Sequence, residues 1–243
     1  MCAETVIPPR WASASESGIA IGPILWVVAI LAVLAAAIAA GSGVFNGDIS
    51  AVKAKAQASA ILEQANLLTI AVQRVVGHGC TDTQISFENP MVSGYVNSNA
   101  PSDKSCHVFD VNGGGINFPT ITASTSDTTD GGKFVFEGSA TFHGLGELIP
   151  DLVGYLPIDS LDLCKQLNTG LGLGGYLGQD LYRNPSDLTR GRFTGQYVHD
   201  HYSVDDGGAW PQGKVMGCVE KTPLSPTSWP ATYYFFFVVL MAR

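Results

Sequence analysis

The chain has 243 residues, 46% of them hydrophobic and 14% charged, and its formal net charge is −8. This composition is too apolar and too rich in aromatic side chains for a disordered chain, and the length allows a sizeable core. Because the acidic excess lies downstream of Gly77, the surface is expected to repel phosphate groups, which excludes nucleic acid as an expected partner.

The N-terminal part of the chain is a polar leader followed by an apolar stretch. Residues 19–40 carry no charge, and a helix of this length covers roughly 33 Å, enough for the hydrocarbon layer of a membrane. Pro23 lies in the first turn of this predicted helix, where its missing N–H disrupts little. A cleaved secretory signal is the alternative, but such signals usually have a shorter apolar region. The stretch therefore predicts a membrane-spanning helix that stays on the mature protein.

The next predicted element is an amphipathic helix that begins near Asp48 or Ser50 and continues to about Val76. Its apolar residues recur at alternating spacings of four and three, which places them on one side of a helix. They form a predicted seam of Ala54, Ala58, Ile61, Ala65, Leu68, Val72 and Val75. Polar and charged side chains occupy the opposite side. We expect the C-terminal half of this helix to pack against a globular domain.

From Gly77 onward the sequence is typical of strands and loops. β-branched and aromatic runs bounded by Gly, Asn, Asp and Pro predict strands over residues 83–87, 107–111, 133–142, 191–204, 214–220 and 232–243. The glycine-rich run from Val111 to Asn117 predicts a hairpin turn. Residues 233–241 are uncharged and apolar, too few for a second membrane span, and predict a buried central strand.

One helix is predicted to interrupt these strands. Pro157 and then Asp159 or Ser160 supply its start signals, and Gly170 follows its end. Its apolar side is expected to consist of Leu161, Cys164 and Leu167.

Four cysteines lie in the C-terminal part, namely Cys80, Cys106, Cys164 and Cys218, and Cys2 is alone in the leader. Neither a C-x-x-C pair nor a histidine at a zinc-like offset accompanies them, so paired cysteines in an oxidising compartment are expected. Four cysteines allow three connectivities. We prefer Cys80–Cys106 with Cys164–Cys218, because neighbours in sequence close loops with the least entropy. Reduced, buried thiols are the alternative.

Few residues in the sequence suggest chemistry. His199 and His201 would share one face of a strand, close to Asp205 and Asp206, and such a set can hold a metal ion. An exposed polar strand edge explains this spacing better, and the Asp-Asp-Gly-Gly run lacks the alternating ligands of a calcium loop. The glycine-rich residues 168–178 lack the Lys-Ser/Thr ending of a phosphate loop. No catalytic residue, metal or cofactor is therefore predicted.

The N-terminal features resemble the type IV pilins and pseudopilins. The resemblance is carried by the leader that ends at Gly18, the apolar helix that opens at Ile19, and the amphipathic extension to about Val76. In that family a dedicated peptidase cuts after the glycine, and the apolar half anchors the subunit in the inner membrane before it packs inside the filament. The resemblance implies that Ile19 is the mature N-terminus. The fifth mature position here is Pro23, where the family typically has a glutamate.

The resemblance also implies a fold and an assembly surface. The expected fold class is α+β, with a long N-terminal hydrophobic-to-amphipathic α-helix packed on an antiparallel β-sheet head. The expected parts are a leader (1–18), an assembly helix (19–76) and a disulfide-linked β-rich head (77–243). Pro23, Trp26 and the seam residues would belong to the assembly helix. A Cys164–Cys218 bridge would resemble the C-terminal disulfide loop of many pilins.

The implied function is that of a structural, non-enzymatic subunit of an extracellular filament or a secretion pseudopilus. Its expected partners are copies of itself, the inner membrane before assembly, the prepilin peptidase and the pilus assembly machinery. The head is expected outside the cytoplasm and later on the cell surface. A membrane-anchored extracytoplasmic binding module that forms no filaments is the alternative. A third class is an anchored hydrolase or metalloenzyme that uses His199 and His201.

Overall fold

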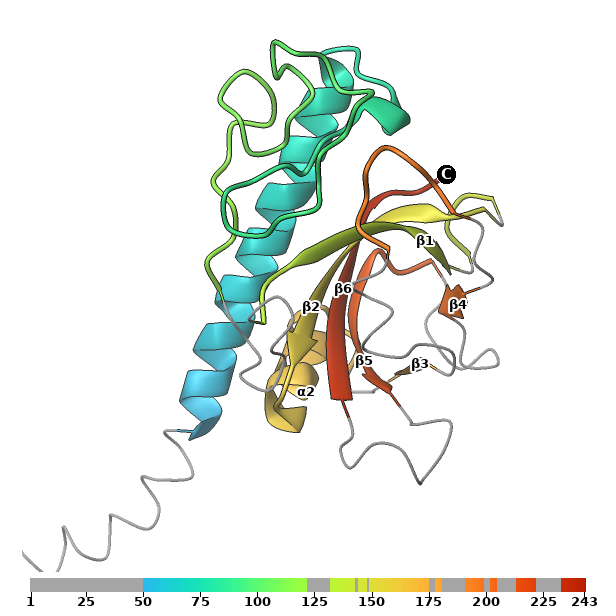
Figure 1. Cartoon of the computed structure of the whole chain (residues 1–243). Coiled ribbons are helices and arrows are strands. Elements are labelled where there is room, and N and C mark those ends of the chain that lie inside the picture. Colours follow the sequence, from blue (N-terminus) through green and yellow to red (C-terminus); the bar gives the residue numbers. More distant parts are fainter. Residues whose placement is uncertain are drawn as a thin grey trace, which may run out of the picture. The chain divides into compact units, whose positions relative to one another are not determined.

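A helix over residues 50–77 lies along one face of a β-sheet (Figure 1). The computed structural model describes residues 50–121, 132–142, 144–147, 149–174, 178–180, 191–198, 202–204, 213–221 and 233–243. All of them belong to one unit, Ser50–Arg243. The predictions for the N-terminal part, namely cleavage between Gly18 and Ile19 and the apolar stretch with Pro23 and Trp26, lie outside the described residues.

The 50–77 helix follows the predicted spacing of its apolar residues. All seven seam positions from Ala54 to Val75 are at most 9% exposed. Six of them, from Ala58 onward, belong to one core cluster together with side chains of the sheet. Lys55 and Gln73, on the opposite side, are exposed. The prediction of a helix with one packed seam is confirmed, and burial of that seam is the main source of the helix's stability.

In the described part of the chain, six strands form one sheet in the order β3-β5-β6-β2-β1-β4. Their bounds are Val135–Phe142 for β1, Asp151–Ile158 for β2, Gly178–Asp180 for β3, Tyr202–Val204 for β4, Met216–Lys221 for β5 and Tyr233–Met241 for β6. The four central strands pair antiparallel. The short outer strands β3 and β4 pair parallel with β5 and β1.

Three predicted strands, over 133–142, 214–220 and 232–243, are confirmed as β1, β5 and β6 with small shifts of their ends, and β5 extends one residue beyond its predicted run. The prediction that the last run is a buried central strand is also confirmed, since β6 lies between β5 and β2. Its side chains alternate between two core clusters. Phe236 and Val238 face the 50–77 helix, whereas Phe235 and Phe237 belong to the cluster on the other face.

A bulge in β1 divides its aromatic side chains between the two faces. The register of β1 with β2 shifts by one residue between Glu137 and Ala140. An inserted residue reverses the alternation of a strand. Phe136 therefore joins the core on the helix side, whereas Phe142 joins the cluster on the opposite face.

Two of the predicted strands are wrong. The only strand-type pairing between residues 83–87 and 107–111 is an isolated bridge between Ser86 and His107. A short 3-10 helix, η1 (Asp82–Gln84), overlaps the first of these segments. The predicted strand over residues 191–204 forms β4 at its end and a single bridge from Arg192 to Glu137 within its described residues.

Strand β2 was not predicted from the sequence. Its residues include Gly154 and Pro157, which are depleted in strands. Pro157 pairs with Phe235 of β6, but the pairing of β2 with β1 ends at Tyr155. The missing N–H of Pro157 is therefore not needed by β1. The prediction that Pro157 is a start signal of the following helix is wrong, because Pro157 belongs to β2.

The second helix of the described chain, α2 (Leu161–Gly170), lies where the sequence predicted it. The hydroxyl of Ser160 accepts a hydrogen bond from the N–H of Leu163, so Ser160 is the N-cap. Cys164 and Leu167 are buried as predicted, whereas Leu161 is exposed. Gly170 is the last residue of the helix and does not follow it.

The predicted fold class requires a correction. A long N-terminal hydrophobic-to-amphipathic helix on an antiparallel sheet, in a pilin-like arrangement, is wrong for the described structure. The first described helix begins at residue 50 and is amphipathic along its length. Among the described residues, neither helix is long and apolar enough to cross a membrane. The sheet is mixed, because its two short outer strands are reached through long connections that permit parallel pairing.

Candidate functional site

Two disulfide bonds fix the frame around the candidate site. Cys80 and Cys106 are joined with a Cα–Cα distance of 5.8 Å, and Cys164 and Cys218 with a distance of 5.4 Å. Both preferred pairings are confirmed. The first bond ties the end of the 50–77 helix to a long loop, and the second ties α2 to β5.

The loop tied by Cys80–Cys106 is held by backbone hydrogen bonds. The N–H of Ser86 donates to the carbonyl of Cys106 at 3.0 Å, and the N–H of Val108 donates to the carbonyl of Ser86 at 2.9 Å. The glycines after Val111 were predicted to form a hairpin turn, which is wrong. They fold back on the loop instead, and the N–H of Gly114 donates to the carbonyl of His107 at 2.9 Å.

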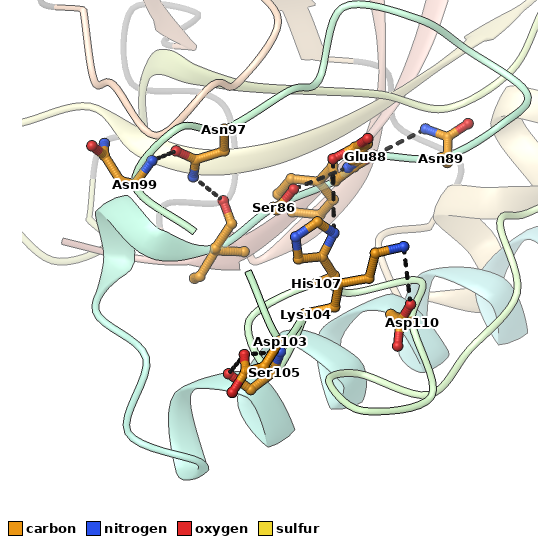
Figure 2. Close-up of polar contacts among 12 residues, drawn as sticks. Ser86, Glu88, Asn89, Asn97, Asn99, Asp103, Lys104, Ser105, His107 and Asp110 are labelled. Atoms are coloured by element: carbon orange, nitrogen blue, oxygen red, sulfur yellow. Dashed lines mark hydrogen bonds and ion pairs between the residues drawn. The ribbon is translucent and has the colours of Figure 1, made fainter. Parts of the chain in front are cut away.

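A polar cluster lies on this loop, and we name it the loop cluster (Figure 2). Its members are Ser86, Glu88, Asn89, Asn97, Asn99, Asp103, Lys104, Ser105, His107 and Asp110. The Nδ1 atom of His107 lies 4.0 Å from a carboxylate oxygen of Glu88, and only 11% of the His107 side chain is exposed. The Nζ atom of Lys104 lies 3.7 Å from a carboxylate oxygen of Asp110.

Hydrogen bonds within the loop cluster set the state of Asp103. Its Oδ1 accepts from the N–H of Ser105 at 2.9 Å and from the hydroxyl of Ser105 at 2.7 Å. These bonds lower the pKa of the Asp103 carboxyl, so it stays ionised to a lower pH than an ordinary aspartate. The cluster therefore presents fixed charges and hydrogen-bonding groups on one loop. This arrangement is suited to polar recognition.

Two buried asparagines, neither of which was predicted from the sequence, support this frame. Asn97 donates from Nδ2 to the carbonyls of Thr83 and Ile85, at 2.9 and 2.8 Å. Asn168 of α2 donates to the carbonyl of Cys218 at 2.8 Å and accepts from the N–H of Cys218 at 2.7 Å. Both side-chain amides form hydrogen bonds with backbone groups that a neighbouring strand would otherwise have to pair with.

Replacing Gly113 by alanine is expected to lower the free energy of unfolding by about 1–3 kcal/mol, the usual cost of overpacking. A Cβ atom at this position would lie 2.1 Å from the carbonyl oxygen of His107. Urea unfolding followed by circular dichroism measures the change. The control is Gly77→Ala, where a Cβ would meet nothing within 4 Å and where we expect little change. Equal midpoints for both variants would contradict this packing of the loop.

The predicted histidine and aspartate candidates, His199, His201, Asp205 and Asp206, lie outside the described residues. Within the described ranges, no group of three or more His, Cys, Asp or Glu side chains could hold a metal ion.

No family model, characterised protein or solved structure matches this chain. The resemblance to pilins and pseudopilins stays a prediction from the sequence.

Proposed function

We propose that the chain is a structural subunit of an extracellular filament or a secretion pseudopilus, and that it assembles with copies of itself through its N-terminal apolar segment. The observation that carries the proposal is the 50–77 helix, both its place in the sequence and the difference between its two sides. In the sequence the apolar stretch of residues 19–40 precedes this helix, with residues 41–49 between them. One side of the helix is buried in the core, and the other carries apolar side chains that are exposed.

Three exposed apolar side chains of the helix lie on the side away from its buried seam. Val52 is 66% exposed, Leu67 38% and Ile70 59%. Their spacings of 15 and 3 residues place all three within about one sixth of a turn of each other on a helix of 3.6 residues per turn. Leu67 and Ile70 are neighbours on this side, one turn apart, and contiguous exposed apolar surface can mark a site of protein contacts. This feature supports assembly better than it supports a plain membrane tether.

The two disulfide bonds support the proposed location. Disulfides persist in oxidising compartments and are rare in the cytosol. In the proposal, the head with its disulfides lies outside the cytoplasm, the apolar segment is held in the inner membrane before assembly, and the filament later extends from the cell surface. The prepilin peptidase would cut between Gly18 and Ile19, and the pilus assembly machinery would be the other partner. The proposal includes no enzymatic activity.

The test is a replacement of residues 19–40 by an unrelated membrane-spanning sequence of the same length in the native cell. We expect surface filaments or secretion to be lost while the anchored, disulfide-bonded head is still made, because packing between like helices depends on their small side chains. Electron microscopy of shed fibres, a secretion assay and non-reducing gels measure these outcomes. The control is Lys165→Ala, an exposed change in α2 that leaves residues 19–40 intact. Normal filaments and normal secretion after the replacement would contradict the proposal.

The second candidate is a membrane-anchored extracytoplasmic binding module, and one observation favours it. Residues 80–121, which include the loop cluster, also carry the exposed apolar side chains Met91 (50%), Val96 (67%) and Val111 (81%). A surface with both kinds of groups is suited to a protein partner. In this case the replacement of residues 19–40 would leave the function intact.

A further inference from the structure

Arg243, which follows β6, contacts chain segments that are far apart in the sequence. Its backbone N–H donates to the Oδ1 atom of Asp151 at 2.9 Å, and its backbone carbonyl accepts from the N–H of Glu147 at 2.5 Å. Its Nε atom lies 3.1 Å from a carboxylate oxygen of Asp82. Its guanidinium carbon lies 3.7 Å from the centre of the Tyr197 ring. We name these five residues the Arg243 clasp.

Asp151 is the buried centre of the Arg243 clasp. It is fully buried at the start of β2, and its second carboxylate oxygen accepts from the N–H of Phe142 at 3.1 Å. Burial raises the pKa of this carboxyl, while the hydrogen bonds from the N–H groups of Arg243 and Phe142 act in the opposite direction. Asp151 therefore joins the end of β1 to Arg243 through one side chain. Loss of either donor would leave a buried acceptor without its partner.

The turn between β1 and β2 is shaped to fit Arg243. Gly146 has a positive φ of 58°, and a Cβ atom there would lie 2.1 Å from the carbonyl oxygen of Arg243. Only glycine allows the backbone to approach this closely. The next residue, Glu147, donates its N–H to the same carbonyl. The position of this turn thus depends directly on Arg243.

Tyr197 connects the Arg243 clasp to the segment that runs beside β1. Its ring packs edge-on against Phe193 with centroids 5.1 Å apart, and Arg243 covers the ring face. Burial, and then the negative charge of Asp82, raise the pKa of the Tyr197 hydroxyl, so it stays protonated. The neighbouring Val198 donates its N–H to the carbonyl of Gly138 at 3.0 Å. Release of Arg243 would uncover the ring and weaken the attachment of this segment.

We propose that the Arg243 clasp couples three segments into one unit that opens and closes cooperatively. The segments are η1, the β1–β2 turn over residues 144–147, and residues 192–198. The Arg243 side chain holds η1 and residues 192–198, whereas its backbone carbonyl holds the turn. Release of the side chain therefore frees two segments directly and loosens the backbone that positions the third, whereas the central strands stay closed. Local opening in cooperative units is common in proteins. The clasp acts in this way whether or not the chain assembles.

The test is hydrogen exchange, read by mass spectrometry, on the full chain and its Arg243→Ala variant. We expect amide exchange in all three segments to become at least about fivefold faster, because the ion pair and the cation–π contact that anchor Arg243 are lost together. Alanine keeps the carbonyl that accepts from Glu147, so faster exchange at residues 144–147 reports the coupling itself. Exchange in β6 and in the 50–77 helix should not change. The control is Lys104→Ala, which removes the separate Lys104–Asp110 pair and should leave the three segments unaffected.

A second variant, Asp82→Asn, keeps the test decisive if Arg243→Ala does not fold. It removes only the charge that pairs with the Nε atom of Arg243. We expect faster exchange in the same three segments, to a smaller extent. If exchange rises only around residue 82 and remains unchanged at residues 144–147 and 192–198, the proposed coupling is wrong. The same conclusion follows if Arg243→Ala folds and affects only one segment.

Discussion

Replacing Cys164 and Cys218 together by alanine is expected to lower the free energy of unfolding by about 4 kcal/mol. The bond joins residues that are 54 positions apart. In the chain-entropy description, a cross-link over a loop of this length reduces the entropy of the unfolded chain by an amount equivalent to about 4 kcal/mol. Both cysteines are fully buried, so the smaller alanine side chains also leave unfilled space in the core. Urea unfolding of the oxidised proteins, followed by far-UV circular dichroism, measures the loss.

The Cys80–Cys106 bond provides a matched comparison for this prediction. Its residues are 26 positions apart, for which the same relation gives about 3.5 kcal/mol. The Cys164→Ala, Cys218→Ala double variant should therefore be destabilised at least as much as the corresponding Cys80, Cys106 variant. A reducing agent should lower the stability of the natural sequence further than that of either variant. An unchanged unfolding midpoint after loss of Cys164–Cys218 would contradict the prediction.

The features that the sequence predicted well are those determined by local patterns. The seam of the 50–77 helix repeats every three to four residues, so each position from Ala54 to Val75 could be assigned to the buried side. The N-cap at Ser160 depends on the residues beside it. The uninterrupted apolar run of β6 could only be accommodated between two other strands. The disulfide pairing followed from loop entropy.

The features that were missed depend on contacts between distant residues. β2 contains Gly154 and Pro157, and its strand conformation comes from pairing with β6 and β1 on either side. Conversely, residues 83–87 and 107–111 have strand-forming side chains but make a single bridge. Tertiary context decides such segments more strongly than intrinsic propensity. The bulge in β1 also has no clear signal in the sequence.

The candidate sites could be predicted only in part. Cys80 and Cys106 pointed to a tied loop, but the Glu88–His107 contact within it depends on how the loop folds back. The Arg243 clasp joins residues 82, 147, 151, 197 and 243, and no local spacing relates these positions. Only the three-dimensional arrangement places an aromatic face and two carboxylates around one arginine.

Phe136 of β1 links the sheet to the disulfide-tied loop. Its ring stacks on Phe87 with centroids 4.2 Å apart and an interplanar angle of 10°. Tyr95, Phe109 and Phe118 also contact it with their rings. In addition, the backbone N–H of Phe136 donates to the hydroxyl of Tyr95 at 2.9 Å. The side chain therefore touches several parts of the loop at once and is fully buried.

Phe136→Ala is expected to lower the free energy of unfolding by about 3–5 kcal/mol, the usual cost of removing a buried phenylalanine ring. Amide protection over residues 85–95 should fall with it, because the loop packs on this ring. The matched control is Phe142→Ala, which removes a similarly buried ring from the other face of the sheet. There the centroids of the Phe142 and Phe237 rings are 4.7 Å apart. Both variants should lose similar stability in urea, but only Phe136→Ala should loosen the loop in native-state hydrogen exchange. If both variants loosen the loop equally, the two core clusters act as one, and the bulge does not divide β1 between separate faces.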